Sequence, residues 1–369
     1  MAGKTRLLNI LLEHVPCGAA NILKQEMLTL GGDAAVARGT VTCSLAATGV
    51  LLMGTLKQFQ ALSQRLPSQP FGLAGLARQL RKVLDQIQSP PQQLHGRGVM
   101  LSLKQPCVMG ILNVTPDSFY DGGRHAGLAS ALRCAETHIK QGADLIDVGG
   151  ESTRPGAPAV SEADEVARVV PVVEALCREF SIPVSVDTTK ACVAEAALAA
   201  GAHFINDVSG LFFDEQMATV VAKADAGLFV MHTRGRPEVM QHNTVYEDLL
   251  GEVIGSLAQS LALARAAGVR AEALCADPGI GFGKSVAGNL ELLRRLPELS
   301  VLGVPILLGT SRKSFIGQVL NQPHADERLF GSLSTVALGV ASGVQIFRVH
   351  DVAATRQVVD MAWAIETQG

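Results

Sequence analysis

The sequence predicts a (β/α)8 TIM barrel preceded by a small N-terminal α/β domain. Eight short apolar runs each end in a polar or charged residue that an ordinary core strand would not need. Stretches with the periodicity of amphipathic helices, such as Leu128–Gln141 and Ser161–Glu179, lie between most of these runs. A strand–helix unit repeated eight times is typical of this barrel, and Pro106 to Trp363 matches its usual size of roughly 250 residues.

The eight predicted strands share an apolar body and a polar C-terminal end. They are Val108–Asn113, Leu145–Glu151, Val184–Asp187, Phe204–Asp207, Leu228–His232, Ala273–Asp277, Ile306–Ser311 and Ile346–His350. In this fold the C-terminal ends of the strands converge on one mouth, where enzymes of this architecture carry their active sites. The pattern therefore predicts where the active site lies before it indicates the chemistry.

Residues 1–95 are expected to form a separate domain, and residues 96–369 the barrel. The apolar runs of the first part are strand-like at Arg6–Leu12 and Gly49–Met53 and helix-like at Ala19–Leu30, Leu56–Leu66 and Leu73–Ile87. Ser89–Gln93 has the composition of a linker. Residues 1–95 contain no evident metal ligands, nucleophile or phosphate loop. Packing or oligomerisation is therefore the favoured role, with regulation or partner binding as the alternative.

Composition excludes several classes of protein. Lys and Arg number 31 against 34 Asp and Glu, and aromatic residues make up 4% of the chain, so neither a basic surface nor base-stacking platforms are indicated for nucleic acid. The 7 cysteines lack paired or C-x-x-C spacing, which indicates reduced thiols in a cytoplasmic protein. The apolar runs Leu7–Leu12 and Leu45–Gly54 are too short for a signal peptide or a membrane span, so we expect no membrane association.

Polar residues at the ends of the third, fourth and sixth strands suit a flat, nitrogen-rich ring. Asp187, Asn206 and Asp277 offer hydrogen-bond acceptors and donors there. The loop Asp277–Ser285 is glycine-rich, but Pro278 stands where a Walker phosphate loop requires glycine. Because proline has no N–H to offer a phosphate, the ATPase interpretation fails, and the glycines are interpreted as turn formers.

Cationic residues at the ends of the seventh and eighth strands indicate a phosphate site. Lys313 follows the seventh strand, and Arg348 and His350 point the same way because side chains alternate along a strand. Barrels commonly bind phosphate after these two strands. A solvated surface pair is the alternative, but the preceding residues, Val344–Phe347, look buried. A nitrogen heterocycle joined to a diphosphate would contact both kinds of residue.

Two long loops complete the predicted mouth. Asn113–Gly123 and Gly149–Gly156 are rich in turn-forming residues, and such loops at a barrel mouth act as substrate walls or lids. The second contains Arg154, which together with backbone N–H groups can bind an anion. Ordinary connections between strand and helix are the alternative for each loop taken alone.

Eight strings at these strand ends resemble the dihydropteroate synthases of folate biosynthesis. They are MGILNVTPDSF (109–119), DVGGESTRPGA (147–157), SVDTTKA (185–191), INDVSG (205–210), MHTRG (231–235), DPGIGFGK (277–284), SRKSFIG (311–317) and RVHDV (348–352). The resemblance covers residues 105–365 and none of residues 1–95. It implies a transferase that condenses 6-hydroxymethyl-7,8-dihydropterin diphosphate with p-aminobenzoate, releasing pyrophosphate and forming 7,8-dihydropteroate.

The resemblance also implies roles for individual residues. Those implied to bind the pterin are Asp187, Asn206, Met231, Asp277 and Lys313. Those implied to bind the diphosphate are Asn113, Arg348 and His350, with Asn113 also a ligand of the Mg²⁺ cofactor. Those implied at the p-aminobenzoate site are Thr153, Arg154, Pro155, Phe282 and Ser314. The catalytic residues would be Asp187, Lys313, Arg348 and His350, since charges at these positions can stabilise the departing pyrophosphate and the pterin cation.

Two alternatives remain, and Tyr120 is the departure from the resembled family for which an effect is expected. A corrinoid-dependent methyltransferase pterin domain would omit the Ser311–Phe315 string and work with a cobalamin partner, and a non-catalytic pterin-binding barrel would bind without turnover. Tyr120 stands where the family usually has a small serine. Tyr120→Ser is expected to change sulfonamide affinity more than substrate affinity. A homodimer formed through the last barrel helices is implied by resemblance alone.

Overall fold

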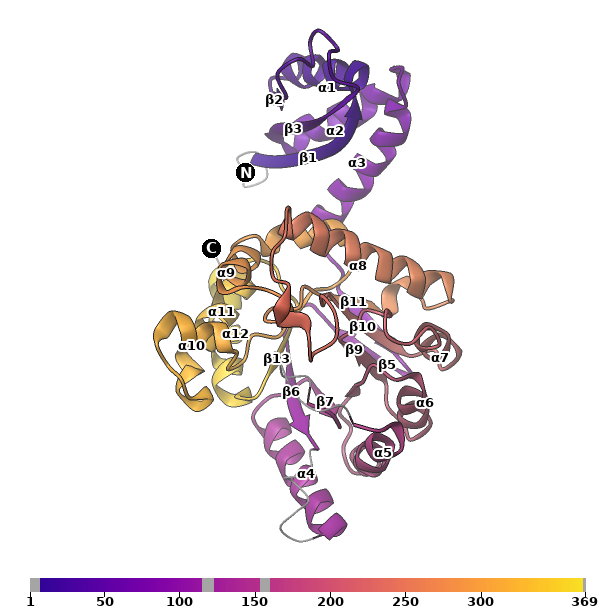
Figure 1. Cartoon of the computed structure of the whole chain (residues 1–369), viewed down its shortest axis with the longest axis vertical. Helices are drawn as coiled ribbons and strands as arrows, with labels where there is room; N and C mark the ends of the chain where they lie inside the picture. Colours follow the sequence, from indigo (N-terminus) through magenta and orange to yellow (C-terminus); the bar gives the residue numbers. More distant parts are fainter. Residues whose placement is uncertain (1–6, 115–122, 153–159, 368–369) are drawn as a thin grey trace. The chain divides into compact units, whose positions relative to one another are not determined.

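The chain divides into two compact units, Met1–Pro90 and Pro91–Gly369. The computed structural model describes residues 7–114, 123–152 and 160–367 (Figure 1). The division falls a few residues before the expected boundary between residues 95 and 96. The reason is that a β-hairpin following the expected linker belongs to the second unit.

The first unit is an antiparallel sheet with helices packed on one face. Its strands, in the order β1-β3-β2, are β1 (Leu7–Pro16), β3 (Ala47–Thr55) and β2 (Asp33–Val36). Its helices are α1 (Cys17–Thr29), α2 (Leu56–Arg65) and α3 (Leu73–Gln88), with a 3-10 turn at Leu66–Ser68. Alternate residues of β3, Val50 and Leu52, are fully buried with Leu23 and Phe59 of the helices. The predicted small N-terminal domain is confirmed, although β2 was not predicted.

The second unit is the predicted barrel. Its described strands are β6 (Cys107–Asn113), β7 (Leu145–Gly149), β8 (Val184–Asp187), β9 (Phe204–Asp207), β10 (Gly227–Met231), β11 (Leu274–Asp277), β12 (Leu307–Leu308) and β13 (Ile346–Val349). They pair in parallel in the order β11-β10-β9-β8-β7-β6-β13-β12, and a bridge between Ala276 and Ile306 closes the ring. Every predicted strand is present, so the predicted fold class is confirmed.

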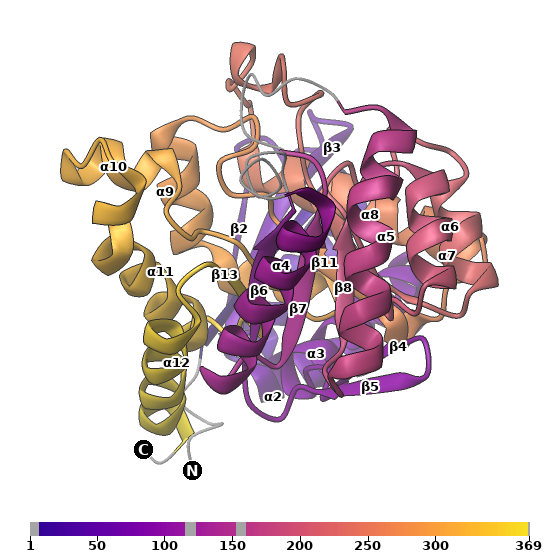
Figure 2. The same ribbon diagram turned by 90° about the horizontal axis from the view of Figure 1, so that it is seen from below.

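Helices surround the barrel, as Figure 2 shows from below. They are α4 (Gly123–Lys140), α5 (Glu162–Glu179), α6 (Ala191–Ala199), α7 (Met217–Lys223), α8 (Leu249–Ala266), α9 (Val286–Arg294), α10 (Ser314–Leu320), α11 (Leu329–Ala341) and α12 (Val352–Thr367). Short 3-10 turns lie at Met240–His242, Ala271–Ala273, Leu296–Leu302 and Ala325–Arg328. Outward-facing strand residues such as Val108 and Val186 pack against these helices. No helix in the described ranges has the length and apolarity needed to cross a membrane.

A β-hairpin packs against the bottom of the barrel. Its strands are β4 (Gln93–Gly96) and β5 (Val99–Ser102). Leu94 and Leu101 of the hairpin pack in one cluster with Met109, Phe204 and Phe229, which come from the barrel strands. Because Val108 packs outward and Met109 belongs to this inner cluster, the odd positions of β6 face the barrel interior.

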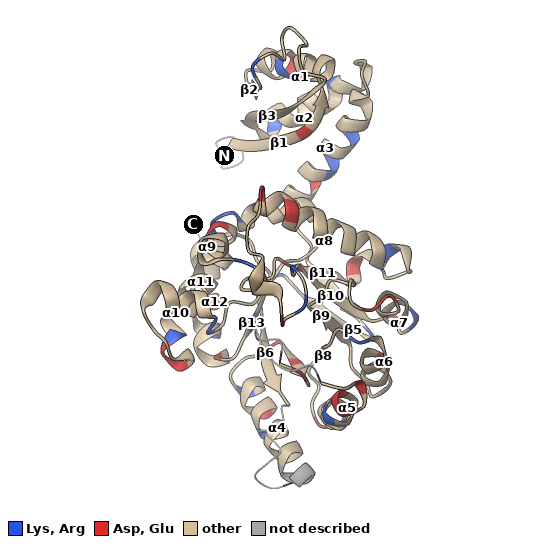
Figure 3. Cartoon of the chain, in the orientation of Figure 1, with Lys and Arg blue, Asp and Glu red and all other residues tan. Residues whose placement is uncertain are grey.

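Charged residues of both signs lie on the outer helices, as the colouring of α4 and α5 in Figure 3 shows. On α5 the acidic residues are concentrated in the first turn, where Glu162, Asp164 and Glu165 meet the positive end of the helix dipole. Ser161 caps this helix, since its hydroxyl accepts a hydrogen bond from the backbone N–H of Asp164. The start of α5 is therefore sharply defined, and it lies directly beside the barrel mouth.

Candidate active site

The polar strand ends lie at the barrel mouth, as the strand pattern predicted. Asp187 ends β8, Asn206 is the inward-facing residue near the end of β9, and Asp277 ends β11. All three side chains are buried, with relative exposures of 6%, 3% and 6%. Buried polar groups require partners, and for Asp187 and Asn206 those partners come from other strands of the barrel.

Arg348 of β13 connects the buried carboxylates. Its Nε donates to Oδ2 of Asp147 at 2.6 Å, and its Nη2 donates to Oδ2 of Asp187 at 2.7 Å. The amide of Asn206 donates to the same Asp147 oxygen at 3.1 Å. Burial opposes the charge of the guanidinium, but Asp147 and Asp187 raise the pKa of Arg348 above its ordinary value. Arg348 is therefore a fixed cation between two carboxylates.

Asp277 and Lys313 lie beside this cluster, around Gly309. A Cβ atom on Gly309 would lie 3.9 Å from Oδ2 of Asp277, from Nζ of Lys313 and from Cβ of Arg348. Burial lowers the pKa of Lys313 to about 8, while the nearby Asp277 carboxylate opposes that change. Three of the predicted site residues thus surround one point at the mouth.

Asn113 lies on the other side of Asp187. It is the last residue of β6 and is exposed. A Cβ atom on Gly149 would lie 3.5 Å from Oδ1 of Asn113 and 3.9 Å from Oδ2 of Asp187. The absence of a side chain at Gly149 therefore leaves space between the predicted metal ligand and the predicted ring-binding carboxylate.

Two carboxylate oxygens of the cluster are left without partners. Oδ1 of Asp187 and Oδ1 of Asp147 are buried and make no hydrogen bond to any described residue. Burial raises the pKa of Asp187 to about 7, although Arg348 opposes this and Asp147 adds to it. Unpaired buried acceptors, one of them with a raised pKa, are typical of a site that is completed by a ligand with N–H donors.

Asp147 is the site residue that the sequence interpretation missed. It lies within the DVGGESTRPGA string, was assigned no role, and is completely buried. The available signal was the alternation of side chains along β7. Leu145 belongs to the inner cluster, so Asp147 and Gly149, at every second position after it, also face the barrel interior. A carboxylate at an inward position of a barrel strand needs a cation, and Arg348 is that cation.

Lys313 also contacts Phe282, one of the predicted p-aminobenzoate residues. Its Nζ donates to the backbone carbonyl of Ile280 and lies 4.7 Å from the centre of the Phe282 ring, which is a cation–π contact. Ser314 begins α10 immediately after Lys313, and its side chain is exposed. Met231 ends β10 and is buried, as expected of a residue that packs against a ring.

Lys284 holds the glycine-rich loop after β11 in place. Its Nζ donates to the carbonyls of Gly279 at 2.9 Å and Phe282 at 3.0 Å, and lies 2.8 Å from Nδ1 of His232. Burial, with a smaller contribution from Lys284, lowers the pKa of His232 to about 3, so the imidazole is neutral and its Nδ1 accepts. Gly279 has a φ of +67°, and a Cβ there would clash with the His232 carbonyl. The lysine of this string is thus an internal anchor of the loop.

His350 follows β13 and contacts the loop that follows β12. Its Nδ1 lies 3.0 Å from Oγ of Ser311, and its backbone N–H donates to the same oxygen at 3.2 Å. The predicted pairing of the seventh and eighth strand ends is therefore present. Other predicted residues, Thr153, Arg154, Pro155 and Tyr120, lie outside the described residues.

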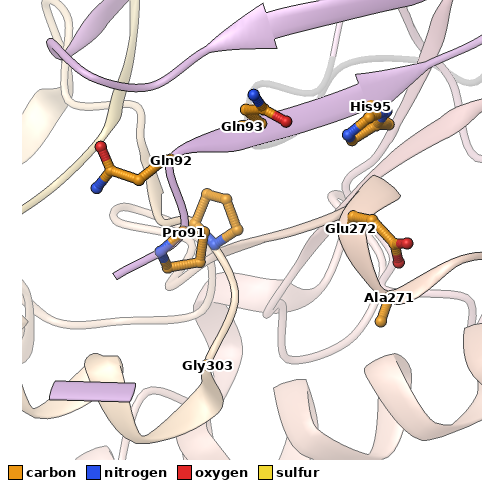
Figure 4. Close-up of a pocket in the computed structure, with 8 residues that line it drawn as sticks. Pro91, Gln92, Gln93, His95, Ala271, Glu272 and Gly303 are labelled. Atoms are coloured by element: carbon orange, nitrogen blue, oxygen red, sulfur yellow. The ribbon is translucent and has the colours of Figure 1, made fainter. Parts of the chain in front are cut away.

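A separate pocket lies at the end of the barrel opposite the mouth. Its volume is about 410 Å³, and Figure 4 shows Gln93 and His95 on the hairpin side and Glu272 and Gly303 on the other. These residues precede the N-terminal ends of β11 and β12 or belong to β4. In this architecture the N-terminal face contributes stability and the C-terminal face carries the chemistry. The mouth, where the predicted residues meet, is therefore the candidate active site.

Comparison with protein families matches residues 109–350 to the family described as pterin binding enzyme. That segment is well over half of the chain and runs from β6 to β13. The chain belongs to the pterin binding enzymes. The matched segment includes every cluster residue described above, from Asn113 to His350.

Individual relatives agree with the family. The dihydropteroate synthase of Synechocystis sp. is 46% identical over 284 residues, which cover 76% of this chain and 98% of that protein. The solved structure of Xanthomonas albilineans dihydropteroate synthase with 4-aminobenzoic acid has a TM-score of 0.70 and 42% identity, covering 75% of this chain and 99% of that one. Both matches are close in length to the second unit, Pro91–Gly369.

One relative extends the similarity into the first unit. The probable bifunctional folylpolyglutamate synthase/dihydropteroate synthase of Halobacterium salinarum is 43% identical over 348 residues. The match covers 94% of this chain but only 42% of that protein. A match of this length includes most of Met1–Pro90, so a related N-terminal unit accompanies a related barrel in that larger protein.

Proposed function

We propose that this pterin binding enzyme is a dihydropteroate synthase. It condenses 6-hydroxymethyl-7,8-dihydropterin diphosphate with p-aminobenzoate to form 7,8-dihydropteroate and pyrophosphate. The observation that carries the proposal is the meeting of Asp187, Asp277, Lys313 and Arg348 at one mouth. Relatives that share 46% and 42% identity bear this name, and one of them was solved with 4-aminobenzoic acid.

The pterin ring would lie against the buried carboxylates and Asn206. The unpartnered oxygens of Asp187 and Asp147 can accept N–H groups of the ring. Asp277 keeps one carboxylate oxygen for the same purpose, because only its Oδ1 is bonded to the backbone N–H of Gly279, at 2.7 Å. Met231 would pack on the ring face. Anionic groups around the ring also stabilise the positive charge that develops when pyrophosphate departs.

The diphosphate would lie toward the cations at the ends of β12 and β13. Lys313, Arg348 and His350 are the groups available to neutralise charge on the departing pyrophosphate. The amine of p-aminobenzoate, seated near Phe282, Ser314 and the segment carrying Thr153 and Arg154, then attacks the carbon that the pyrophosphate leaves. No covalent intermediate with an enzyme nucleophile is needed.

Mg²⁺ is proposed as the cofactor, with Asn113 as its protein ligand. Mg²⁺ is commonly bound by one or two protein oxygens together with water and substrate phosphates, and the exposed amide oxygen at the end of β6 suits that arrangement. The described residues contain no group of three His, Cys, Asp or Glu that could hold a metal by themselves. When bound, the ion supplies positive charge to the departing diphosphate.

A coupled assay on the full chain tests the proposed reaction. With both substrates and Mg²⁺, pyrophosphate and dihydropteroate should form in equal amounts, and omission of p-aminobenzoate should stop both. Binding of the pterin diphosphate without any turnover would instead identify a non-catalytic pterin-binding barrel.

We also propose a homodimer formed through α11 and α12, which pack side by side. Phe330 and Leu338 of α11 and Met361 and Ile365 of α12 have relative exposures of 61–79%. Neighbouring exposed apolar side chains of this size are typical of protein interfaces. A second copy would cover them.

Replacing Leu338 with arginine is expected to convert the dimer to a monomer, because two arginines would be buried at a twofold apolar interface. Light scattering after size-exclusion chromatography measures the change. Val245→Arg is the matched control, since Val245 is 80% exposed and lies outside α11 and α12. A wild-type protein that is monomeric at micromolar concentration would contradict the proposal.

A reducing, cytoplasmic setting is proposed as well. All seven cysteines are free, and three of them, Cys17, Cys107 and Cys275, are buried. Burial raises the pKa of Cys107 to about 12, which keeps that thiol protonated and unreactive. Free thiols in this number are typical of a reducing compartment.

A further inference from the structure

Three charged side chains beside the ring-binding cluster connect two loops of the mouth. Nζ of Lys190 donates to Oε2 of Glu151 at 2.6 Å and to Oε2 of Glu165 at 2.5 Å. Lys190 follows β8, Glu151 follows β7, and Glu165 lies in the first turn of α5. We call Lys190, Glu151 and Glu165 the Lys190 clamp.

Glu151 also joins the two ends of the connection between β7 and α5. Its Oε1 accepts a hydrogen bond from the backbone N–H of Val160 at 2.9 Å. Residue 151 precedes and residue 160 follows the segment that carries Thr153 and Arg154. The Glu151 carboxylate therefore contacts the end of this connection through Oε1 and Lys190, in the loop after β8, through Oε2.

The entrance of the connection is held equally closely. Arg168 of α5 donates to the carbonyl of Gly150 at 3.1 Å. A Cβ on Gly150 would lie 2.6 Å from Cγ2 of Val169 and 3.0 Å from Cγ of Glu165, so only glycine fits between β7 and α5. The backbone from Gly150 to Glu151 is thus pressed against the helix that contributes Glu165.

The Lys190 clamp is more buried than an ordinary surface ion pair. The side chain of Glu165 is 1% exposed, and those of Lys190 and Glu151 are 20% and 21% exposed. Exposed ion pairs contribute little, whereas charges removed from water are costly unless they are well paired. Two carboxylates sharing one partly buried ammonium therefore add little net stability, which points to a role in fixing geometry.

The clamp lies directly beside Asp187. A small cavity of about 80 Å³ is lined by the three clamp residues and by Asp187 and Thr188. The backbone N–H of Lys190 also donates to Oγ1 of Thr188 at 3.2 Å, which fixes the short turn that follows Asp187. Movement of the clamp would therefore shift the β7–α5 connection relative to Asp187.

We propose that Lys190 and Glu151 are positioning residues that fix both ends of the β7–α5 connection relative to Asp187. Neither residue is among those proposed above to bind a substrate. Resting on the proposed function, the inference is that they align the p-aminobenzoate residues of this connection with the pterin bound at Asp187. Small displacements of a reacting partner cost large factors in rate and apparent affinity, because the reaction depends on near-contact geometry.

The test compares KM values for the two substrates. Lys190→Met should raise the KM for p-aminobenzoate roughly tenfold, while the KM for the pterin diphosphate changes by less than about twofold. Lys190→Arg should restore much of the loss, because it retains a cation for both carboxylates. Lys140→Met is the matched control, since it removes an exposed pair with Glu136 on α4 and should change neither KM.

A second variant distinguishes a loss of positioning from a loss of folding. Lys190→Met alone leaves Glu165 buried without its cation, whereas Lys190→Met combined with Glu165→Gln removes both charges and should fold. The double variant should show the same difference between the two KM values and faster amide hydrogen exchange at Val160. Equal changes in both KM values, or unchanged exchange at Val160, would overturn the proposal. Absence of turnover in the wild type would refute the proposed function instead, and the exchange measurement would still test the clamp.

Discussion

Arg348→Met is expected to reduce kcat/KM by roughly 10²–10³-fold and to destabilise the protein by about 3–5 kcal/mol. The change leaves two buried carboxylates, Asp147 and Asp187, without the guanidinium that bonds both. Asp147 is completely buried and Asp187 nearly so, hence water cannot replace the lost cation. Denaturant unfolding and steady-state kinetics on the same preparation measure the two effects.

A double variant separates these effects. Arg348→Met combined with Asp147→Asn should regain much of the lost stability, because one uncompensated charge is removed, but should regain no activity. Arg295→Met is the control, since Arg295 pairs with two carboxylates at the surface and its loss should cost no more than about 1 kcal/mol. If the double variant were as unstable as the single one, the buried-charge explanation would be wrong.

Ligand binding to the Arg348 variant tests its contact with the diphosphate. Arg348→Ala should weaken binding of the pterin diphosphate about 10- to 100-fold. The loss should be smaller for the pterin without its diphosphate, because the carboxylates that bind the ring remain. Isothermal titration with both ligands measures the difference. Identical losses would show that Arg348 acts only through the ring-binding carboxylates.

The sequence predicted the polar ends of the strands better than the contacts across the barrel. Arg348 was placed at the mouth because it shares a face with His350 at the end of the eighth predicted strand, and in the structure it contacts Asp187 there. Its partner Asp147 lies 201 residues earlier, on β7, and β6 separates the two strands. The alternation of side chains along a strand predicts whether a residue faces the barrel interior. Only the closed barrel determines which long side chains meet across that interior.

Short elements stabilised by distant contacts were the least predictable. The hairpin β4–β5 has four-residue strands, and Leu94 and Leu101 give no pattern until they pack with Phe204 and Phe229. In the same way, Ile306–Ser311 was predicted as one strand, but only Leu307–Leu308 is a strand in the structure. Local propensity is weak in such segments, so tertiary packing decides their conformation.

Lys284 shows why a chemical motif needs its surroundings. Its string resembles a phosphate loop, and the sequence argued against that interpretation from Pro278 alone. The structure adds that the ammonium is buried and bonded to loop carbonyls, and burial lowers the pKa of Lys284 to about 7. Burial of a lysine in a loop cannot be inferred from spacing, because it depends on His232 arriving from another strand.

Asp187→Asn is expected to lower kcat/KM by roughly 10²–10³-fold without destabilising the protein at pH 8. Burial raises the pKa of Asp187 to about 7, Arg348 opposes this, and the carboxylates of Asp147 and Glu165 add to it. Because an ionised carboxylate is the stronger acceptor for ring N–H groups, wild-type activity should fall as the pH drops through about 7. The variant has no carboxyl group at this position, so its residual activity should not show this fall as the pH drops through about 7.

Stability should show the opposite dependence on pH. The folded protein binds a proton at Asp187 more tightly than the unfolded chain, whose carboxyl has a pKa near 3.8. This group therefore stabilises the fold fully below about pH 4, and that contribution is lost as the pH rises through about 7. From pH 5 to pH 8, the free energy of unfolding of Asp187→Asn should consequently rise relative to wild type. Asp225→Asn, at an exposed pair with Arg270, should show no such change, and parallel curves for Asp187→Asn and wild type would rule out a raised pKa at Asp187.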